Sequence, residues 1–174
     1  MIPSSELILN PDGSIYHLNL KPGQIAHDII TVGDPQRVEN ITRHFESIEF
    51  STVKREFKTQ TGHYKGKRLT VISTGIGPDN IDIVLNELDA LVNVDFQARE
   101  IREQHTSLNI IRIGTSGSIH ADIPTGSFVL ARKAIGTDNM LRSYITENHT
   151  DADFEDAFIK HTNWLPEKGR PYAV

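Results

Sequence analysis

The sequence predicts an α/β fold. Short apolar runs rich in β-branched residues alternate along the chain with stretches of helical spacing, as in such folds. Loops of glycine and small polar residues follow three of the apolar runs, at 33–37, 74–78 and 114–118. Because α/β sheets bind their ligands in loops at strand ends, we expect the chemistry of this chain at the sheet edge that carries these loops.

Composition narrows the class of protein. The chain has 174 residues, 37% of them hydrophobic and 24% charged, which suits one globular domain spanning 1–174. The net charge of −5 argues against nucleic acid or an anionic membrane as partners. The sequence has no cysteine, which excludes disulfides and thiolate metal sites. It shows no signal peptide and no run long enough for a membrane span, so we expect a cytoplasmic protein.

Residues 1–28 form an irregular lead-in. Asn10–Gly13 has the residue types of a turn. The segment 15–20 then alternates apolar and polar residues, which predicts a short strand or extended arm. His17 lies in this arm, where residue types alone favour a surface histidine.

The first strand is expected at Ile29–Val32, and a helix follows it. Asp34 is a good N-cap and Pro35 fits the first helical position. A strand, a glycine and a helix N-terminus together form a recurring phosphate site, because free N–H groups and the helix dipole point at the anion. Arg37 in the first turn is unfavourable against that dipole unless an anion compensates, although an exposed arginine is an equal alternative.

The middle of the chain predicts a hairpin and a second helix. Residues 50–61 include the alternating segment 54–58, read as a strand, and 62–67 turns the chain into a strand at 69–73. The loop 74–78 lacks the dinucleotide fingerprint. A helix follows, with apolar residues at helical spacing: Ile81, Val84, Leu85, Leu88 and Leu91.

The segment 110–118 is the central feature of the sequence. A loop with some helix at 97–103 precedes it, and Ile110, Ile111 and Ile113 predict a strand buried on both faces. Arg112 interrupts this apolar run, and an unpaired buried guanidinium is very costly. Its anion is either an internal carboxylate or a bound phosphate, the latter because the small-residue loop follows at once.

The rest of the chain has weaker signals. We expect a turn at 122–126, a strand at 127–131, a helix with an acidic N-terminus leading into Phe154 and Phe158, and a loop-like end. The eight histidines show no metal-ligand spacing, so no metal site is predicted with them.

Four motifs in register resemble one enzyme family. They are Gly33–Val38, Arg55–Phe57, Ser73–Gly77 and Arg112–Gly117. Across about 14–135 the chain resembles nucleoside phosphorylases of the purine nucleoside and uridine phosphorylase family, particularly the uridine branch. The resemblance implies a mixed β-sheet flanked by helices in three layers. That fold would be incomplete at the C-terminus, because family members continue well past the equivalent of Val174.

The resemblance also implies roles for individual residues. The phosphate site of one subunit would consist of Gly33, Arg37, Arg112 and Thr115, with Arg112 and Thr115 acting in catalysis. Arg55 would come from the neighbouring subunit.

Nucleoside contacts are implied as well. His17 would reach across the dimer to the ribose 5′-hydroxyl, so the resemblance reverses the surface interpretation of this histidine. Thr115, Ser116 and Gly117 would form the loop between phosphate, ribose and base. A monovalent cation is implied at Glu56, Ile76 and Asn80, although Asn80 replaces the usual serine.

The implied activity is phosphate-dependent cleavage of a nucleoside, with uridine favoured, giving ribose 1-phosphate and free base. Inorganic phosphate would be the co-substrate, without a cofactor, in a homo-oligomer built from dimers with shared active sites (a hexamer in the family). The residues that read the base lie beyond this chain in the family, so we expect 1–174 alone to be inactive and to expose apolar sheet surface. Two alternatives stay open: a non-catalytic phosphate- or nucleoside-binding fragment or interaction module, and a nucleosidase, which uses water and needs no three-arginine clamp.

Overall fold

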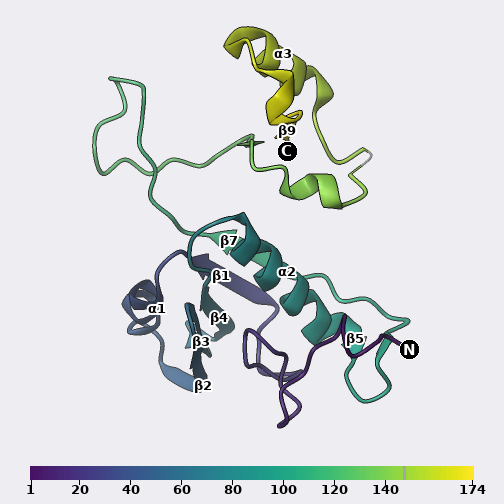
Figure 1. The fold of residues 1–174 in the computed structure, drawn as a ribbon. Helices are drawn as coiled ribbons and strands as arrows, with labels where there is room; N and C mark the ends of the chain where they lie inside the picture. The colour runs from purple at the N-terminus through teal and green to yellow at the C-terminus, as the bar shows by residue number, and fades with distance from the viewer. Residues whose placement is uncertain (147) are drawn as a thin grey trace. The chain divides into compact units, whose positions relative to one another are not determined.

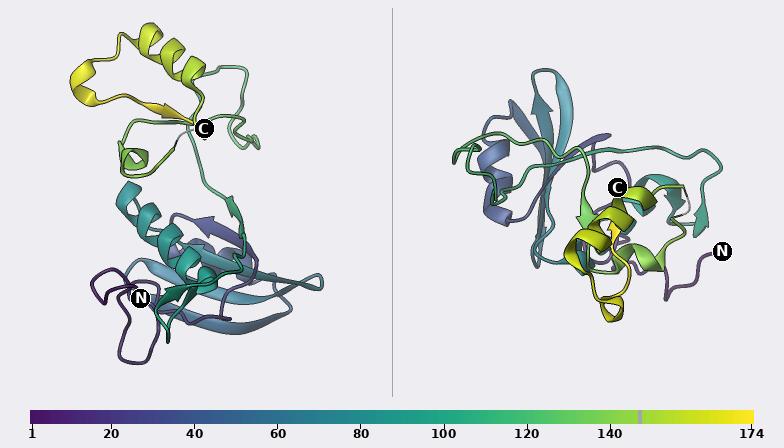
Figure 2. Two further views of the ribbon diagram at one scale, coloured as in Figure 1. Left: turned by 90° about the vertical axis from the view of Figure 1, so that its right-hand side faces the viewer. Right: turned by 90° about the horizontal axis from the view of Figure 1, so that it is seen from above.

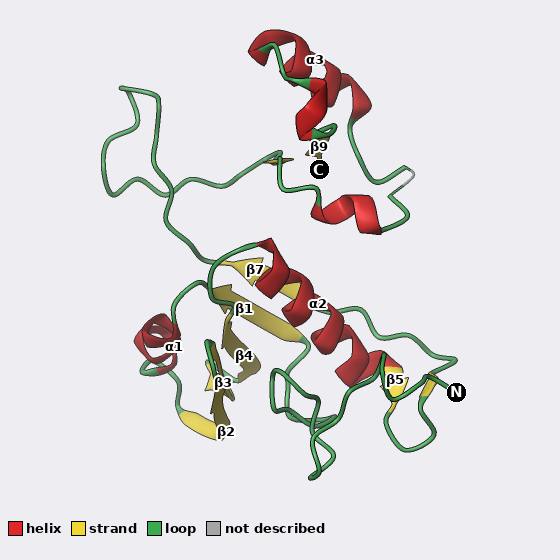
Figure 3. Cartoon of the chain, in the orientation of Figure 1, coloured by secondary structure: helices red, strands yellow, loops and turns green. Residues whose placement is uncertain are grey.

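A computed structural model describes residues 1–146 and 148–174 of the chain. These residues form two compact units, Met1–Thr115 and Ser116–Val174 (Figure 1), and each is described by itself. That 1–174 constitutes a single phosphorylase-like domain stays a prediction. The α/β class is confirmed, because the first unit is a mixed sheet covered by helices (Figure 3).

The sheet has five strands in the spatial order β2-β3-β4-β1-β7. Their bounds are Asp28–Val32 for β1, Ser47–Lys54 for β2, Phe57–Tyr64 for β3, Lys67–Ser73 for β4 and Asn109–Arg112 for β7. Strands β2, β3 and β4 form an antiparallel meander, whereas β1 runs parallel to both β4 and β7. The carboxyl ends of β1, β4 and β7 therefore meet at one edge of the sheet, which carries the three small-residue loops.

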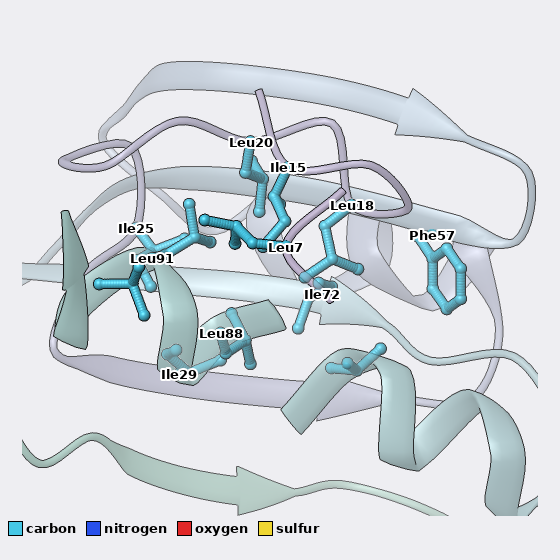
Figure 4. Packing of buried hydrophobic residues seen from close by; sticks show 12 residues of the cluster. Leu7, Ile15, Leu18, Leu20, Ile25, Ile29, Phe57, Ile72, Leu88 and Leu91 are labelled. Atoms are coloured by element: carbon cyan, nitrogen blue, oxygen red, sulfur yellow. The ribbon is translucent and has the colours of Figure 1, made fainter. Parts of the chain in front are cut away.

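Helices α1 (Pro35–Thr42) and α2 (Pro78–Asn93) cover opposite faces of this sheet (Figures 1 and 2). Side chains alternate between the faces along a strand, so neighbouring residues of β1 and β4 enter different clusters. The α1 face buries Val32, Val38 and Val71. The α2 face buries a larger cluster that includes Ile29, Ile72, Val84, Leu88 and Leu91 (Figure 4). The predicted α/β/α layering is thus present in the first unit.

The N-terminal segment completes the larger cluster without forming the predicted strand. Residues 16–18 are turns, and the only bridge described there joins Leu9 to Ile15. The apolar residues of the alternating segment, Ile15, Leu18 and Leu20, are nevertheless buried (Figure 4). The side-chain amide of Asn10 donates to the Ile15 carbonyl oxygen at 3.0 Å. This hydrogen bond satisfies a carbonyl group that would otherwise need a neighbouring strand as its partner.

Two other segments differ from the sequence-based expectation. The strand predicted at 54–58 is broken by the turn at Arg55 and Glu56 that joins β2 to β3. The helix predicted at 97–103 is absent, and a short hairpin of β5 (Val94–Asp95) and β6 (Glu100–Ile101) occurs instead. The Asp95 carboxylate accepts the backbone N–H groups of the intervening turn, an alternative to the helix that aspartate often provides.

Strand β7 is exposed, contrary to the prediction of a strand buried on both faces. Among the described residues it is the edge strand and pairs with β1 alone, so Ile110 and Ile111 are 38% and 64% exposed. The expectation of exposed apolar surface on the sheet is confirmed at this strand. The β-branched apolar residues Ile110, Ile111 and Ile113 predicted the strand correctly, but its neighbours in space decide whether it is buried.

The second unit contains short elements around one helix. They are β8 (Ile135–Gly136), the 3-10 helices η1 (Met140–Ser143) and η2 (Pro166–Lys168), helix α3 (Ala152–Thr162) and β9 (Tyr172–Ala173). Asp151 caps α3 as its acidic start predicts, and the side chain of Glu155 is buried against Arg170 and the Ala173 N–H. Burial and the Asp138 carboxylate raise the pKa of Tyr172 to about 12.

The strand predicted at 127–131 is absent, and Phe128 and Leu130 are fully exposed. Among the described residues no strand pairs with this segment, and an apolar run without a ladder partner gains nothing from an extended conformation.

Candidate functional site

The site is built where β1 and β7 end. The parallel register pairs Thr31 with Arg112, so Arg112 comes level with the loop that begins at Gly33. A Cβ placed on Gly33 would lie 3.8 Å from Nη2 of Arg112 and 3.9 Å from the carbonyl oxygen of Gly75. The structure therefore brings the first loop, the second loop and the Arg112 guanidinium together at one sheet edge.

The Arg112 side chain is exposed rather than buried, because β7 is an edge strand. No carboxylate of the described residues forms an ion pair with it, so the internal partner considered from sequence is not found there. Gly114 lies against the same side chain, with its added Cβ 3.8 Å from Nε of Arg112. The guanidinium thus lies beside two glycines and retains its hydrogen-bonding capacity for an external anion.

Helix α1 begins at the same edge. The Asp34 carboxylate accepts from the Gln36 N–H at 2.7 Å, and Pro35 occupies the first turn, as its residue type predicts. Arg37 is half-buried in this first turn, and within 1–146 and 148–174 its side chain forms no ion pair or hydrogen bond. A cation at this position opposes the helix dipole, which favours an anion beside it.

Arg55 lies at the tip of the β2–β3 hairpin, with a left-handed φ of 55° and an exposed side chain. The hairpin is tied to the end of β4, because the Ser73 hydroxyl donates to the Glu56 carbonyl at 2.6 Å. Arg55 thus extends from a braced turn, and no described carboxylate pairs with its side chain. The alternation at 54–58 predicts one continuous strand, so residue types alone do not reveal the turn that places Arg55.

The three residues of the implied cation site are neighbours. A Cβ on Gly75 would lie 2.8 Å from Cγ of Glu56 and 2.6 Å from Nδ2 of Asn80. That same Nδ2 donates to the Ile76 carbonyl at 3.2 Å. The Ile76 carbonyl oxygen, which a cation would use as a ligand, therefore already accepts a hydrogen bond from Asn80. Among the described residues no group of three His, Asp or Glu side chains could hold a metal ion.

His17 is half-buried and bound to a residue that sequence reasoning missed. Its Nδ1 lies 2.7 Å from Oε1 of Glu87, on α2. The two residues are 70 positions apart, and nothing in the sequence links them. The interpretation of His17 as a plain surface histidine does not describe this environment.

The loop 115–117 is placed only in part. Thr115 ends the first unit, three residues after Arg112, whereas Ser116 and Gly117 belong to the second. All three residues are exposed and outside regular secondary structure. Within the first unit the structure therefore brings together Gly33, Gly75 and Arg112, and the roles of Ser116 and Gly117 stay predictions.

Comparison with known proteins identifies the family. The model of the phosphorylase superfamily matches residues 28–169. A uridine phosphorylase of Thermococcus kodakarensis is 31% identical over 153 residues, which cover 87% of this chain and 50% of that protein. A DeoD-type purine nucleoside phosphorylase of Alkaliphilus metalliredigens is 36% identical over 125 residues, 71% of this chain and 48% of the relative.

Solved structures agree with these matches. A Trypanosoma brucei nucleoside phosphorylase that shows uridine phosphorylase activity superposes with a TM-score of 0.84 at 36% identity. The match covers 96% of this chain and 57% of that one. A uridine phosphorylase of the oomycete Phytophthora capsici gives a TM-score of 0.60 at 29% identity, over 72% of this chain and 40% of that one.

The chain spans about half the length of the curated relatives it matches. In the part of the chain that the structure describes, no helix is long and apolar enough to cross a bilayer. The family match covers the sheet edge that carries Gly33, Arg37, Arg55 and Arg112. The fold, the order of the motifs and the comparisons agree: this chain belongs to the phosphorylase superfamily.

Proposed function

We propose that this chain is part of a cytoplasmic nucleoside phosphorylase that uses inorganic phosphate to cleave the N-glycosidic bond of a nucleoside, with uridine favoured. The products are ribose 1-phosphate and the free base. The uridine preference is supported by the motifs around Arg112 and by the names of the Thermococcus kodakarensis relative and the Trypanosoma brucei structure, whereas the Alkaliphilus metalliredigens relative is named a purine nucleoside phosphorylase. Phosphate is the co-substrate, and no other cofactor takes part.

One observation carries the proposal: the Arg112 guanidinium lies beside Gly33 at the carboxyl ends of parallel strands, without a carboxylate partner among the described residues. A bound phosphate would contact this guanidinium on the side that faces Gly33, because glycine has no side chain to block it. Arg37 would add a second charge from the first turn of α1, and Thr115 a hydroxyl three residues after Arg112. Arginine suits this task because its planar fork binds phosphate oxygens in pairs.

The chemistry follows from these charges. A phosphate oxygen forms a bond to ribose C1′ while the bond from C1′ to the base nitrogen breaks, and the departing base takes up a proton. The transition state resembles an oxocarbenium ion, so the held phosphate also stabilises the developing positive charge on the sugar. The arginines align the phosphate for attack on C1′ and replace the water molecules around it. The reaction requires no covalent enzyme intermediate.

The site is completed by other parts in this proposal. Arg55 and His17 act in the active site of a neighbouring subunit, in a homo-oligomer built from dimers, with His17 at the ribose 5′-hydroxyl. Thr115, Ser116 and Gly117 form the loop between phosphate, ribose and base. Residues 1–174 bind phosphate, whereas turnover needs groups that read the base and the ribose from further along the protein.

The test separates binding from turnover. Phosphate binding to residues 1–174 is measured by ³¹P NMR. Phosphate-dependent loss of uridine absorbance is measured on the full-length protein, called the long product below. Arg112→Ala should abolish both signals with most of the fold intact, while Arg43→Ala, an exposed arginine at the end of α1, should change neither.

Each alternative predicts a different result. A long product that binds phosphate yet cleaves no nucleoside would favour a binding module, and base release without phosphate would favour a nucleosidase. Cleavage by the Arg112→Ala variant at saturating phosphate would refute the proposed role of Arg112.

A further inference from the structure

The turn that carries His17 is held by one carboxylate from a distant part of the chain. Glu87 on α2 accepts from the backbone N–H of His17 at 2.9 Å and from that of Leu18 at 2.7 Å. Its Oε1 also lies 2.7 Å from the ring Nδ1 of His17. Two backbone donors and one imidazole nitrogen therefore converge on a single side chain.

Both partners are sheltered from water. The side chain of Glu87 is 12% exposed and that of His17 is 25% exposed. Leu18 and Leu88, the sequence neighbours of the pair, are fully buried in the larger cluster (Figure 4). Apolar packing on each side thus fixes the separation of the carboxylate and the imidazole, and water competes little for their hydrogen bonds.

Tyr16, the residue before His17, is also held. The ammonium group of Lys54 donates to the Tyr16 carbonyl and to Oδ1 of Asn10, and it lies 4.2 Å from the centroid of the Tyr16 ring. The Tyr16 ring meets the His17 ring edge to face, with centroids 4.8 Å apart. The imidazole is therefore fixed at Nδ1 and along one side, and no described residue hydrogen-bonds to its Nε2.

These contacts decide which ring nitrogen carries hydrogen. An ionised carboxylate only accepts hydrogen bonds, so the nitrogen that faces Glu87 must be the donor. A neutral imidazole with hydrogen on Nδ1 presents a lone pair at Nε2. We propose that Glu87 is a positioning residue that fixes the Nδ1–H form of His17 and leaves Nε2 as the acceptor for a substrate hydroxyl. The hydroxyl part of this inference rests on the proposed function, whereas the tautomer part does not.

The direct test is spectroscopic and needs no turnover. Long-range ¹H–¹⁵N correlation spectra of ¹⁵N-histidine-labelled chain, at about pH 8 where free imidazole is neutral, report which nitrogen is protonated. The His17 signal is identified by its loss in His17→Gln. We expect the Nδ1–H form in the unaltered chain and the Nε2–H form in Glu87→Ala.

A matched control variant makes the result specific. Asp89→Asn should have no effect, because this exposed carboxylate on α2 bonds Asn93 instead. An Nε2–H form in the unaltered chain, or an unchanged spectrum in a folded Glu87→Ala variant, would overturn the inference whatever the activity.

The kinetic arm uses the long product and compares uridine with 5′-deoxyuridine. Glu87→Ala should raise KM for uridine about tenfold, because an imidazole that is no longer held at Nδ1 loses its alignment and with it one hydrogen bond to the 5′-hydroxyl, and KM for 5′-deoxyuridine should stay unchanged. Equal rises for both substrates would reduce Glu87 to a structural brace. If no nucleoside is cleaved but the tautomer responds as expected, the proposed function fails and the tautomer assignment stands.

Discussion

Replacing Gly33 by alanine should separate ligand binding from stability. The added Cβ would stand 3.8 Å from Nη2 of Arg112, an ordinary van der Waals distance, so the folded chain accommodates it. Gly33 does not have a left-handed φ, and the substitution restricts the unfolded chain more than it strains the folded one. The free energy of unfolding should therefore stay unchanged or rise by up to about 1 kcal/mol.

The same substitution, Gly33→Ala, should weaken phosphate binding. A phosphate oxygen must come within about 2.8 Å of the guanidinium nitrogen to form a charge-assisted hydrogen bond. The methyl group would occupy the glycine side of Nη2, where that oxygen is proposed to lie. Loss of one such bond costs about 1.5–3 kcal/mol, so Kd for phosphate should rise at least about tenfold.

The two quantities are measured on the same samples, by urea denaturation for the free energy of unfolding and by ³¹P NMR titration for Kd. Arg43→Ala serves as the control for a surface change near α1. A Gly33→Ala variant that is as stable as the unaltered chain and binds phosphate equally well would refute the placement of the anion between Gly33 and Arg112.

Three further predictions concern the fold. Gly62→Ala places a Cβ 2.0 Å from the Ser47 carbonyl oxygen on β2, so we expect a loss of about 3 kcal/mol or more in urea denaturation; an unchanged midpoint would contradict the packing of β2 on β3. We expect the exposed apolar edge strand β7 to promote self-association, and Ile111→Lys, which charges this strand, should reduce that association in sedimentation velocity; an unchanged profile would show that this edge does not drive association. The pKa of Tyr172 is raised to about 12, so its phenol stabilises the folded second unit below about pH 10, the ordinary pKa, and this contribution is lost as pH rises toward 12. Tyr172→Phe, which removes the hydroxyl bonded to Asp138, should flatten that decline in alkaline unfolding curves, and an unaltered slope would exclude this phenol as its cause.

Local residue types predicted the first unit well wherever the structure is decided locally. The strand at β1, the Asp34 cap with Pro35 behind it, and helix α2 depend on periodicity and capping, and all three occur as expected. The four motifs in register identified the family, which the matched superfamily model bears out.

Tertiary structure decided the rest. The β-branched apolar residues of 110–113 predict an extended strand. Its exposure is determined by the position of β7 at the sheet edge. The pairing of Thr31 with Arg112 brings the arginine to Gly33, and the packing of α2 brings Glu87 to His17 across 70 residues. Contacts between residues so far apart depend on the path of the whole chain, because spacing along a sequence specifies a face of a helix or strand and not the element that this face meets.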